Sequence, residues 1–135
     1  MNIKACLSSN SDNWRTPENI YKEFMNKGYI DTFKFLSEED ELLNNYRNNK
    51  LFVNPPFSIM ENVITWVINQ YFNNNDIALL IPARTDTRYF HSLIKIIDNA
   101  IIYFIKGRLR YNDTNPAPFP TILIILKHGE RGGVL

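Results

Sequence analysis

Residues 50–72 read KLFVNPPFSIMENVITWVINQYF and contain the signals for a strand, a rigid loop and a helix in direct succession. The apolar run Lys50–Val53 is typical of a short buried strand, and it stops at a loop that two prolines fix, Asn54-Pro55-Pro56-Phe57. Apolar residues then recur at helical intervals from Met60 to Phe72, which predicts an amphipathic helix.

The chain after this helix predicts a second strand beside the first. Ile77–Ile81 (IALLI) is a continuous apolar run, as in strands that are buried on both faces of a parallel sheet. It ends in the polar loop Pro82–Thr87 (PARTDT). Because the carboxyl ends of parallel strands meet at one edge of a sheet, we expect this loop and residues 54–57 to lie on the same edge.

The flanking segments supply the other elements of an α/β domain. Thr16 is predicted to cap a helix whose first residue is Pro17 and which ends near Gly28, a glycine suited to a left-handed cap. The charged, asparagine-rich segment 37–49 is expected to be an exposed helix or loop. A further helix is predicted at Tyr89–Ile97, and further strands at Tyr29–Phe33, Ala100–Phe104, Lys106–Tyr111 and Thr121–Leu126.

This order of elements predicts an α/β fold with a mostly parallel, doubly wound sheet, an antiparallel end and helices on both faces. The chain has 135 residues, of which 44% are hydrophobic, so it has the size of one domain and enough apolar residues for one core. We expect residues 1–135 to form that domain, with 1–13 as an N-terminal segment and 129–135 as a flexible tail.

Charge, cysteine content and hydropathy argue against several functional classes. The net charge of +1 is not that of a wholly basic nucleic-acid binder, although many of the cationic residues lie in the second half of the chain. The single Cys6 excludes an internal disulfide, and no Cys and His residues have zinc-ligand spacing, so no metal is expected. The sequence has neither an apolar leader nor a run of about 18 apolar residues, which predicts a cytoplasmic protein without a membrane partner.

The loop at residues 54–57 carries the groups that chemistry at a conjugated amine requires. Such an amine is a poor nucleophile, because its lone pair is delocalised into the ring. Acceptors aimed at the amine protons draw the nitrogen toward tetrahedral geometry, and the Asn54 side-chain oxygen and the Pro55 carbonyl oxygen are suitable acceptors. Pro55 and Pro56 would fix the direction of that carbonyl, and Phe57 would stack on a flat ring held out of a helix.

Six short segments recur in the same order in a known family. They are Trp14-Arg15-Thr16-Pro17, Ile30-Asp31, Asn54-Pro55-Pro56-Phe57-Ser58, residues 79–87 (LLIPARTDT), Lys106-Gly107-Arg108 and Ala117-Pro118-Phe119-Pro120. From Trp14 to the end of the last predicted strand, the chain thereby resembles the phage-type DNA N-6-adenine methyltransferase family.

The resemblance implies a compact, Rossmann-like methyltransferase domain of phage or prophage origin that acts in the host cytoplasm. It implies methyl transfer from S-adenosylmethionine to the N6 amine of adenine in DNA, with a catalytic group made of Asn54, Pro55, Pro56 and Phe57. The donor would be bound by Trp14, Thr16, Pro17, Asp31 and Asn54. The candidates for DNA contact are Ser58, Arg84, Thr85, Asp86, Arg88, Arg108 and Arg110. A homodimer is one way for so small a domain to grip a duplex.

Structural roles compete with these assignments. A tight loop between a strand and a helix uses the same residue types as residues 54–57. An aspartate at the end of a strand, such as Asp31, often caps a turn, and Trp14 can equally be a core or lid aromatic. Surface ion pairs are the commoner fate of charges such as Arg84, Asp86, Arg88, Arg108 and Arg110. His91 and His128 lack triad-like neighbours, so we expect them to lie on a helix surface and at the terminus, and we expect Cys6 to be inert.

Two rival functions stay open. In the first, the same loop acts on glutamine amides of proteins, although Phe57 and the basic second half favour nucleic acid. In the second, the chain is a catalytically degenerate relative that binds DNA or a host defence protein as a counter-defence factor. The small size of the chain and the segment Thr32-Phe33-Lys34 after Asp31 favour this second rival. The retained acceptors of residues 54–57 favour the enzyme.

Overall fold

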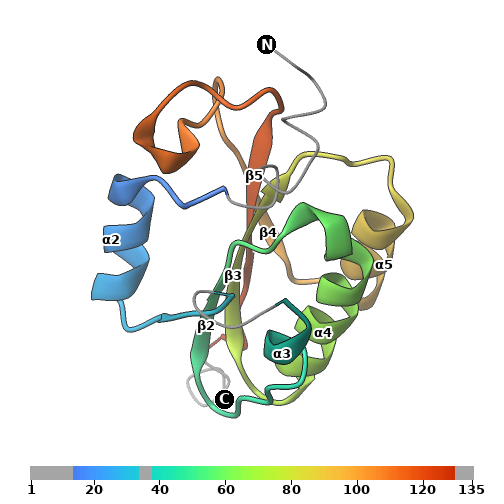
Figure 1. The fold of residues 1–135 in the computed structure, drawn as a ribbon. Helices are drawn as coiled ribbons and strands as arrows, with labels where there is room; N and C mark the ends of the chain where they lie inside the picture. The colour runs from blue at the N-terminus through green and yellow to red at the C-terminus, as the bar shows by residue number, and fades with distance from the viewer. Residues whose placement is uncertain (1–13, 34–37, 130–135) are drawn as a thin grey trace.

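The computed structural model describes residues 14–33 and 38–129, which form a five-stranded sheet with helices on both faces (Figure 1). The strand order is β1-β2-β3-β5-β4, with β1 at Ile30–Asp31, β2 at Lys50–Val53, β3 at Asp76–Pro82, β4 at Ile101–Phe104 and β5 at Thr121–Leu126. β1, β2 and β3 pair in parallel, whereas β5 is antiparallel to both β3 and β4. The fold is α/β as predicted, with the antiparallel pairings at the β4 end of the sheet. The sheet is mixed and only partly parallel, because β5 is reversed between β3 and β4.

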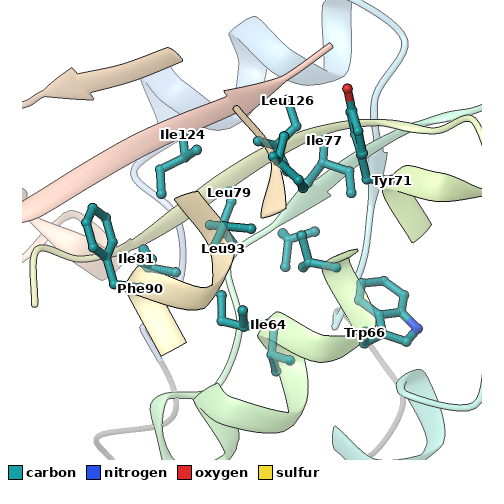
Figure 2. Packing of buried hydrophobic residues seen from close by; sticks show 14 of the residues in the cluster. Ile64, Trp66, Tyr71, Ile77, Leu79, Ile81, Phe90, Leu93, Ile124 and Leu126 are labelled. Atoms are coloured by element: carbon teal, nitrogen blue, oxygen red, sulfur yellow. The ribbon is translucent and has the colours of Figure 1, made fainter. Parts of the chain in front are cut away.

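Alternate side chains of the central strands enter two separate apolar cores. Leu51 and Val53 of β2 belong to the core beneath α4 (Met60–Phe72) and α5 (Arg88–Ile96). Figure 2 shows this core, in which side chains of β3 and β5 meet those of the two helices. Phe52 points to the other face, where it packs against Phe24 of α2 (Glu18–Asn26). Burial on both faces explains why β2 and β3 have continuous apolar sequences.

The strand-loop-helix unit that the sequence defines most strongly is confirmed. β2, α4 and β5 have the predicted bounds, and β3, α5 and β4 lie within one residue of theirs at each end. Gly28 has a φ of 87°, as expected of the residue that ends α2 in the left-handed conformation. None of the described helices has the length and apolar character that a membrane span requires.

The predicted start of the first helix was wrong. α2 begins at Glu18, and Pro17 takes the cap position without a side-chain cap bond. Thr16 does not cap the helix, because its hydroxyl oxygen accepts a hydrogen bond from Asn54 Nδ2 at 2.9 Å instead.

The predicted strand at Lys106–Tyr111 was also wrong. This segment is an irregular loop that leads into the short 3-10 turn η3 (Tyr111–Asp113). Its apolar residues Leu109 and Tyr111 pack against the Phe52 face of the sheet from the loop. Their alternation with polar residues therefore reflects packing of a loop and not strand pairing.

Segment 37–49 contains a buried carboxylate that the sequence did not indicate. Glu41 ends the short helix α3 (Glu38–Glu41) and is only 4% exposed. Its oxygens accept hydrogen bonds from Phe33 N at 2.9 Å, Asn44 Nδ2 at 2.7 Å and Tyr46 Oη at 3.1 Å. Burial, and then the charge of Glu41, raise the pKa of Tyr46. The predicted N-terminal segment with Cys6 and the tail beyond Gly129 lie outside the described residues.

Candidate active site

The loop at residues 54–57 lies at the carboxyl edge of the parallel strands. It follows Val53 of β2, which pairs with Leu79 of β3, and it leads through the 3-10 turn η2 (Phe57–Ile59) into α4. Because β2 and β3 are parallel, the loop that follows β3 leaves from this same edge, as predicted. Asp31, at the end of β1, pairs with Phe52, two residues before Asn54. Three neighbouring strands therefore bring candidate site residues to one edge of the sheet.

The Asn54 amide is held by the segment that precedes α2. Asn54 Nδ2 donates hydrogen bonds to the Trp14 carbonyl oxygen at 2.6 Å and to Thr16 Oγ1 at 2.9 Å. A carbonyl oxygen can only accept, so the amide nitrogen must be the atom that faces Trp14. Asn54 Oδ1 therefore points the other way, where it is buried and has no hydrogen-bond partner among residues 14–33 and 38–129.

Four aromatic rings form a cluster around Trp14, the residue whose carbonyl oxygen accepts a hydrogen bond from this amide. Trp14 lies nearly parallel to Phe57, with ring centroids 6.2 Å apart and an interplanar angle of 15°. Phe119 stands edge-on to both rings, at 5.3 Å from Trp14 and 5.2 Å from Phe57, and Tyr111 meets the edge of Trp14 at 5.8 Å. Trp14 Nε1 is buried and, like Asn54 Oδ1, has no hydrogen-bond partner within the described part of the chain. The site therefore contains one unpaired donor and one unpaired acceptor beside a flat aromatic surface.

The η3 turn holds the segment that carries Trp14 and Thr16. Arg15 N donates to Asn112 Oδ1 at 2.7 Å, and Asn112 N donates to the Arg15 carbonyl oxygen at 2.8 Å. Asp113 Oδ1 accepts from Glu18 N at 3.3 Å. Asn112 and Asp113 have φ values of 59° and 54°, a conformation that Asn and Asp tolerate better than most residues. The turn therefore fixes the backbone on both sides of Thr16.

Burial determines the ionisation of the one tyrosine in this cluster. Burial raises the pKa of Tyr111 to about 12, although the hydrogen bond with Thr121 partly opposes the shift. Tyr111 Oη lies 3.2 Å from Thr121 Oγ1. The phenol is neutral at physiological pH and does not supply a base.

The second loop at this edge is polar and exposed. The side chains of Arg84, Thr85 and Asp86 are exposed, and Thr87 caps α5 by accepting from Phe90 N at 3.4 Å. Within residues 14–33 and 38–129, no ion pair joins Arg84, Asp86 or Arg88 to another residue, so the alternative of an ion-pair cluster is not found there. A hydrogen bond from Ala83 N to the Pro120 carbonyl oxygen, at 2.9 Å, joins this loop to the segment before β5 that carries Phe119.

A basic surface begins at this loop and follows α5. An open depression of about 490 Å³ is lined by Arg88, His91, Ser92, Ile94 and Lys95. His91 is exposed on the helix, as predicted. Arg108 and Arg110 are exposed in another loop, where Arg110 Nη1 donates to the Thr114 carbonyl oxygen at 3.1 Å. These cations do not form one cluster with the Asn54 loop in the way that Trp14 and Thr16 do.

The remaining site candidates differ in their exposure to solvent. Pro17, Pro55 and Pro56 are buried, Asp31 is half-buried, and Ser58 is exposed in η2. Among the described residues, no group of three or more His, Cys, Asp or Glu side chains is arranged to hold a metal ion. His128 has a structural contact, because its ring stacks on Tyr71 with centroids 4.2 Å apart and Nε2 lies 2.7 Å from the Tyr71 carbonyl oxygen.

Sequence reasoning missed three residues that build the site: Phe119, Tyr111 and Asn112. Phe119 lies inside the Ala117–Pro120 segment that carried part of the resemblance, so a signal for it was present. That segment precedes β5 and does not form a strand. Tyr111 and Asn112 lie in a stretch that we predicted to be the end of a strand, so their contacts with residues 14 and 15 had no signal in the sequence.

Comparison with known proteins assigns the family. Residues 4–118 match the family described as DNA N-6-adenine-methyltransferase (Dam). No curated protein and no solved structure gives a match. The matched range includes the Trp14–Pro17 segment, Asp31 and the Asn54–Phe57 loop. Since the match spans most of the chain and all the residues that hold the Asn54 amide, the protein belongs to the DNA N-6-adenine-methyltransferase family.

Proposed function

We propose that the protein transfers a methyl group from S-adenosylmethionine to the N6 amine of adenine in DNA, at a site centred on Asn54. The observation that carries this proposal is the buried Asn54 Oδ1, which has no partner among the described residues. An unpaired buried acceptor costs about 1–3 kcal/mol, so a ligand that donates a hydrogen bond to it is favoured. The protons of an exocyclic amine are such donors.

The second unpaired atom supports adenine as the base. Trp14 Nε1 is a donor, and it is buried beside the same loop. Adenine presents an amine donor next to a ring-nitrogen acceptor. The two unpaired groups of the site, Asn54 Oδ1 and Trp14 Nε1, are therefore of the kinds that this edge of the base would complete. Phe57 offers a flat ring on which the base can stack.

Catalysis then depends on the acceptors and on positioning. Asn54 Oδ1 and the Pro55 carbonyl oxygen accept hydrogen bonds from the amine, which reduces the conjugation of its lone pair with the ring. The hydrogen bonds from Asn54 Nδ2 keep that acceptor directed to one place. The proton lost from the amine can pass to water, so no side chain with a lowered pKa is required.

The carboxyl edge of the sheet also has groups that fit the methyl donor. S-adenosylmethionine, when bound, supplies an electrophilic methyl group. Asp31 is a half-buried carboxylate at the end of β1, one strand away from Asn54. A carboxylate is suited to the ribose hydroxyls or the ammonium group of the donor. Helices on both faces of a sheet with β5 reversed between β3 and β4 support a Rossmann-like methyltransferase fold, whose ligands bind at this edge.

Asn54→Ala tests the proposal directly. We expect loss of methyl transfer to adenine-containing DNA by at least about 100-fold, the order found when a single positioned group of a catalytic site is removed. Affinity for S-adenosylmethionine, measured by calorimetry, should change little. Asn69→Ala is the matched control, because Asn69 is exposed on α4. Equal activity of Asn54→Ala and the wild-type protein would refute the acceptor mechanism, and absence of donor binding by the wild-type protein would favour the non-catalytic rival.

A further inference from the structure

Thr16 lies in the segment before α2, yet its contacts are with the Asn54 loop. It is 8% exposed, and Oγ1 accepts a hydrogen bond from Asn54 Nδ2 at 2.9 Å. The resemblance placed Thr16 at the methyl donor. We infer that Thr16 is instead a positioning residue for the Asn54 amide, an inference that rests on the proposed function.

Two acceptors are needed because each restricts the amide in a different way. The Trp14 carbonyl oxygen lies 2.6 Å from Nδ2, so a flip that placed Oδ1 there would bring two acceptor oxygens together. The Trp14 carbonyl therefore decides which way the amide faces. The last torsion of an asparagine side chain is broad, however, and one hydrogen bond leaves it room to rotate. The bond to Thr16 Oγ1 takes the second hydrogen of Nδ2 and narrows that rotation.

The surroundings of Thr16 make it a firm support. Arg15, the preceding residue, forms reciprocal hydrogen bonds with Asn112 at 2.7 and 2.8 Å. On the other side, Pro17 has a fixed φ and is buried, and its carbonyl oxygen accepts from Ile20 N and Tyr21 N. Thr16 is therefore held between two anchored residues. Because a misplacement of about 1 Å can cost on the order of 100-fold in rate, support of this kind should be visible in turnover.

The central experiment compares Thr16→Val, which keeps the shape but removes the acceptor, with Thr16→Ser, which keeps the hydroxyl. We expect Thr16→Val to lower kcat for adenine methylation by about tenfold or more, with KM for DNA and Kd for S-adenosylmethionine within about twofold of wild type. Thr16→Ser should recover most of the lost kcat. Thr65→Val is the control, because Thr65 is exposed on α4 and, among the described residues, its hydroxyl bonds only to the Glu61 carbonyl oxygen.

A second measurement does not depend on activity. The Asn54 side-chain amide gives an NMR signal pair that Asn54→Ala identifies by its disappearance. We expect these amide protons to exchange slowly with water in the wild-type protein and in Thr16→Ser, and markedly faster in Thr16→Val. This readout decides whether Thr16 holds the amide even if the wild-type protein methylates no DNA, which would refute the proposed function alone.

The inference is overturned by any of three results. They are unchanged amide exchange in Thr16→Val, a loss in Thr16→Ser as large as that in Thr16→Val, and a loss confined to KM or donor affinity. The last result would return Thr16 to a role in donor binding. Thermal unfolding of each variant separates these results from a general loss of the fold.

Discussion

The nitrogen and the oxygen of the Asn54 side-chain amide differ in their hydrogen bonding. Its nitrogen makes two hydrogen bonds, whereas its buried oxygen has no partner in the described part of the chain. The loop was predictable, because prolines directly after an apolar strand have few other uses. The hydrogen bonds that hold the Asn54 amide were not predictable, since the two partner residues lie 40 and 38 residues away in the sequence. A contact of that kind exists only after the sheet has assembled.

Phe57 should contribute through its flat ring rather than its volume. It contacts Trp14 and Phe119 and is partly buried. We expect Phe57→Leu, which keeps an apolar side chain, to weaken binding of adenine-containing DNA by on the order of 1–3 kcal/mol, the range for a base stacked on an aromatic ring. Fluorescence anisotropy with labelled DNA measures this change.

Two further substitutions serve as controls for the Phe57→Leu experiment. Phe57→Tyr keeps the ring and should bind DNA nearly as the wild-type protein does. Phe72→Ala removes a phenylalanine that is 63% exposed on α4 and should have no effect on binding. Normal binding by Phe57→Leu would mean that the base does not stack on this ring.

At the scale of helices and strands, hydrophobic periodicity predicted the regular element α4 and failed for the irregular segment 106–111. α4 has its predicted bounds because its apolar residues recur through several helical turns and pack on one core. The segment 106–111 shows alternation without a strand, since Leu109 and Tyr111 reach the core from a loop. That loop satisfies its backbone locally, as in the bond from Ala117 N to the Leu109 carbonyl oxygen at 2.8 Å.

α5 should be the element that meets the DNA backbone. Arg88 and Lys95 line the depression on its surface, and its first turn follows the loop at the carboxyl edge of β3. We expect Arg88→Ala with Lys95→Ala to weaken binding to all DNA sequences alike. The slope of log affinity against log salt should fall by about 1 for each cation that contacts a phosphate.

The control for α5 lies at the opposite edge of the sheet. Lys127 follows Leu126, which pairs with Ile77 near the start of β3. Lys127→Ala removes one positive charge far from the site and should leave the salt dependence unchanged. An unchanged slope in the α5 double variant would remove this helix from the DNA surface.

At the scale of the whole molecule, three segments that are distant in sequence contact one another at the site. The segment before α2, the loop after β2 and the residues before β5 supply Trp14, Phe57 and Phe119 to one aromatic cluster. The site therefore depends on the tertiary arrangement of all three parts of the chain. The single-domain organisation and the homodimer stay predictions.

The tyrosine that supports this cluster gives the fold a pH dependence at alkaline pH. Tyr111 has a pKa of about 12 when folded, against an ordinary value of 10.0. Because the folded value is raised, the stabilisation is complete below pH 10 and is lost as pH rises through the folded pKa. The difference of about two pKa units corresponds to on the order of 2–3 kcal/mol of unfolding free energy.

Urea unfolding at several alkaline pH values tests this assignment. Tyr111→Phe should be less stable than wild type at neutral pH, by about 1 kcal/mol for the lost bond to Thr121. It should then lose less stability than wild type as the pH is raised above 10. Parallel pH profiles for the two proteins would contradict the assignment.

The peptide bond between Asn54 and Pro55 also bears on how long the protein stays chemically intact. Spontaneous deamidation of asparagine begins when the backbone nitrogen of the next residue loses its proton and attacks the side-chain amide. The nitrogen of Pro55 carries no proton, so this route is closed at Asn54. Conversion to aspartate would replace the donor that faces the Trp14 carbonyl with an oxygen. Pro55, which shapes the loop, thus also protects the Asn54 amide from deamidation by this route.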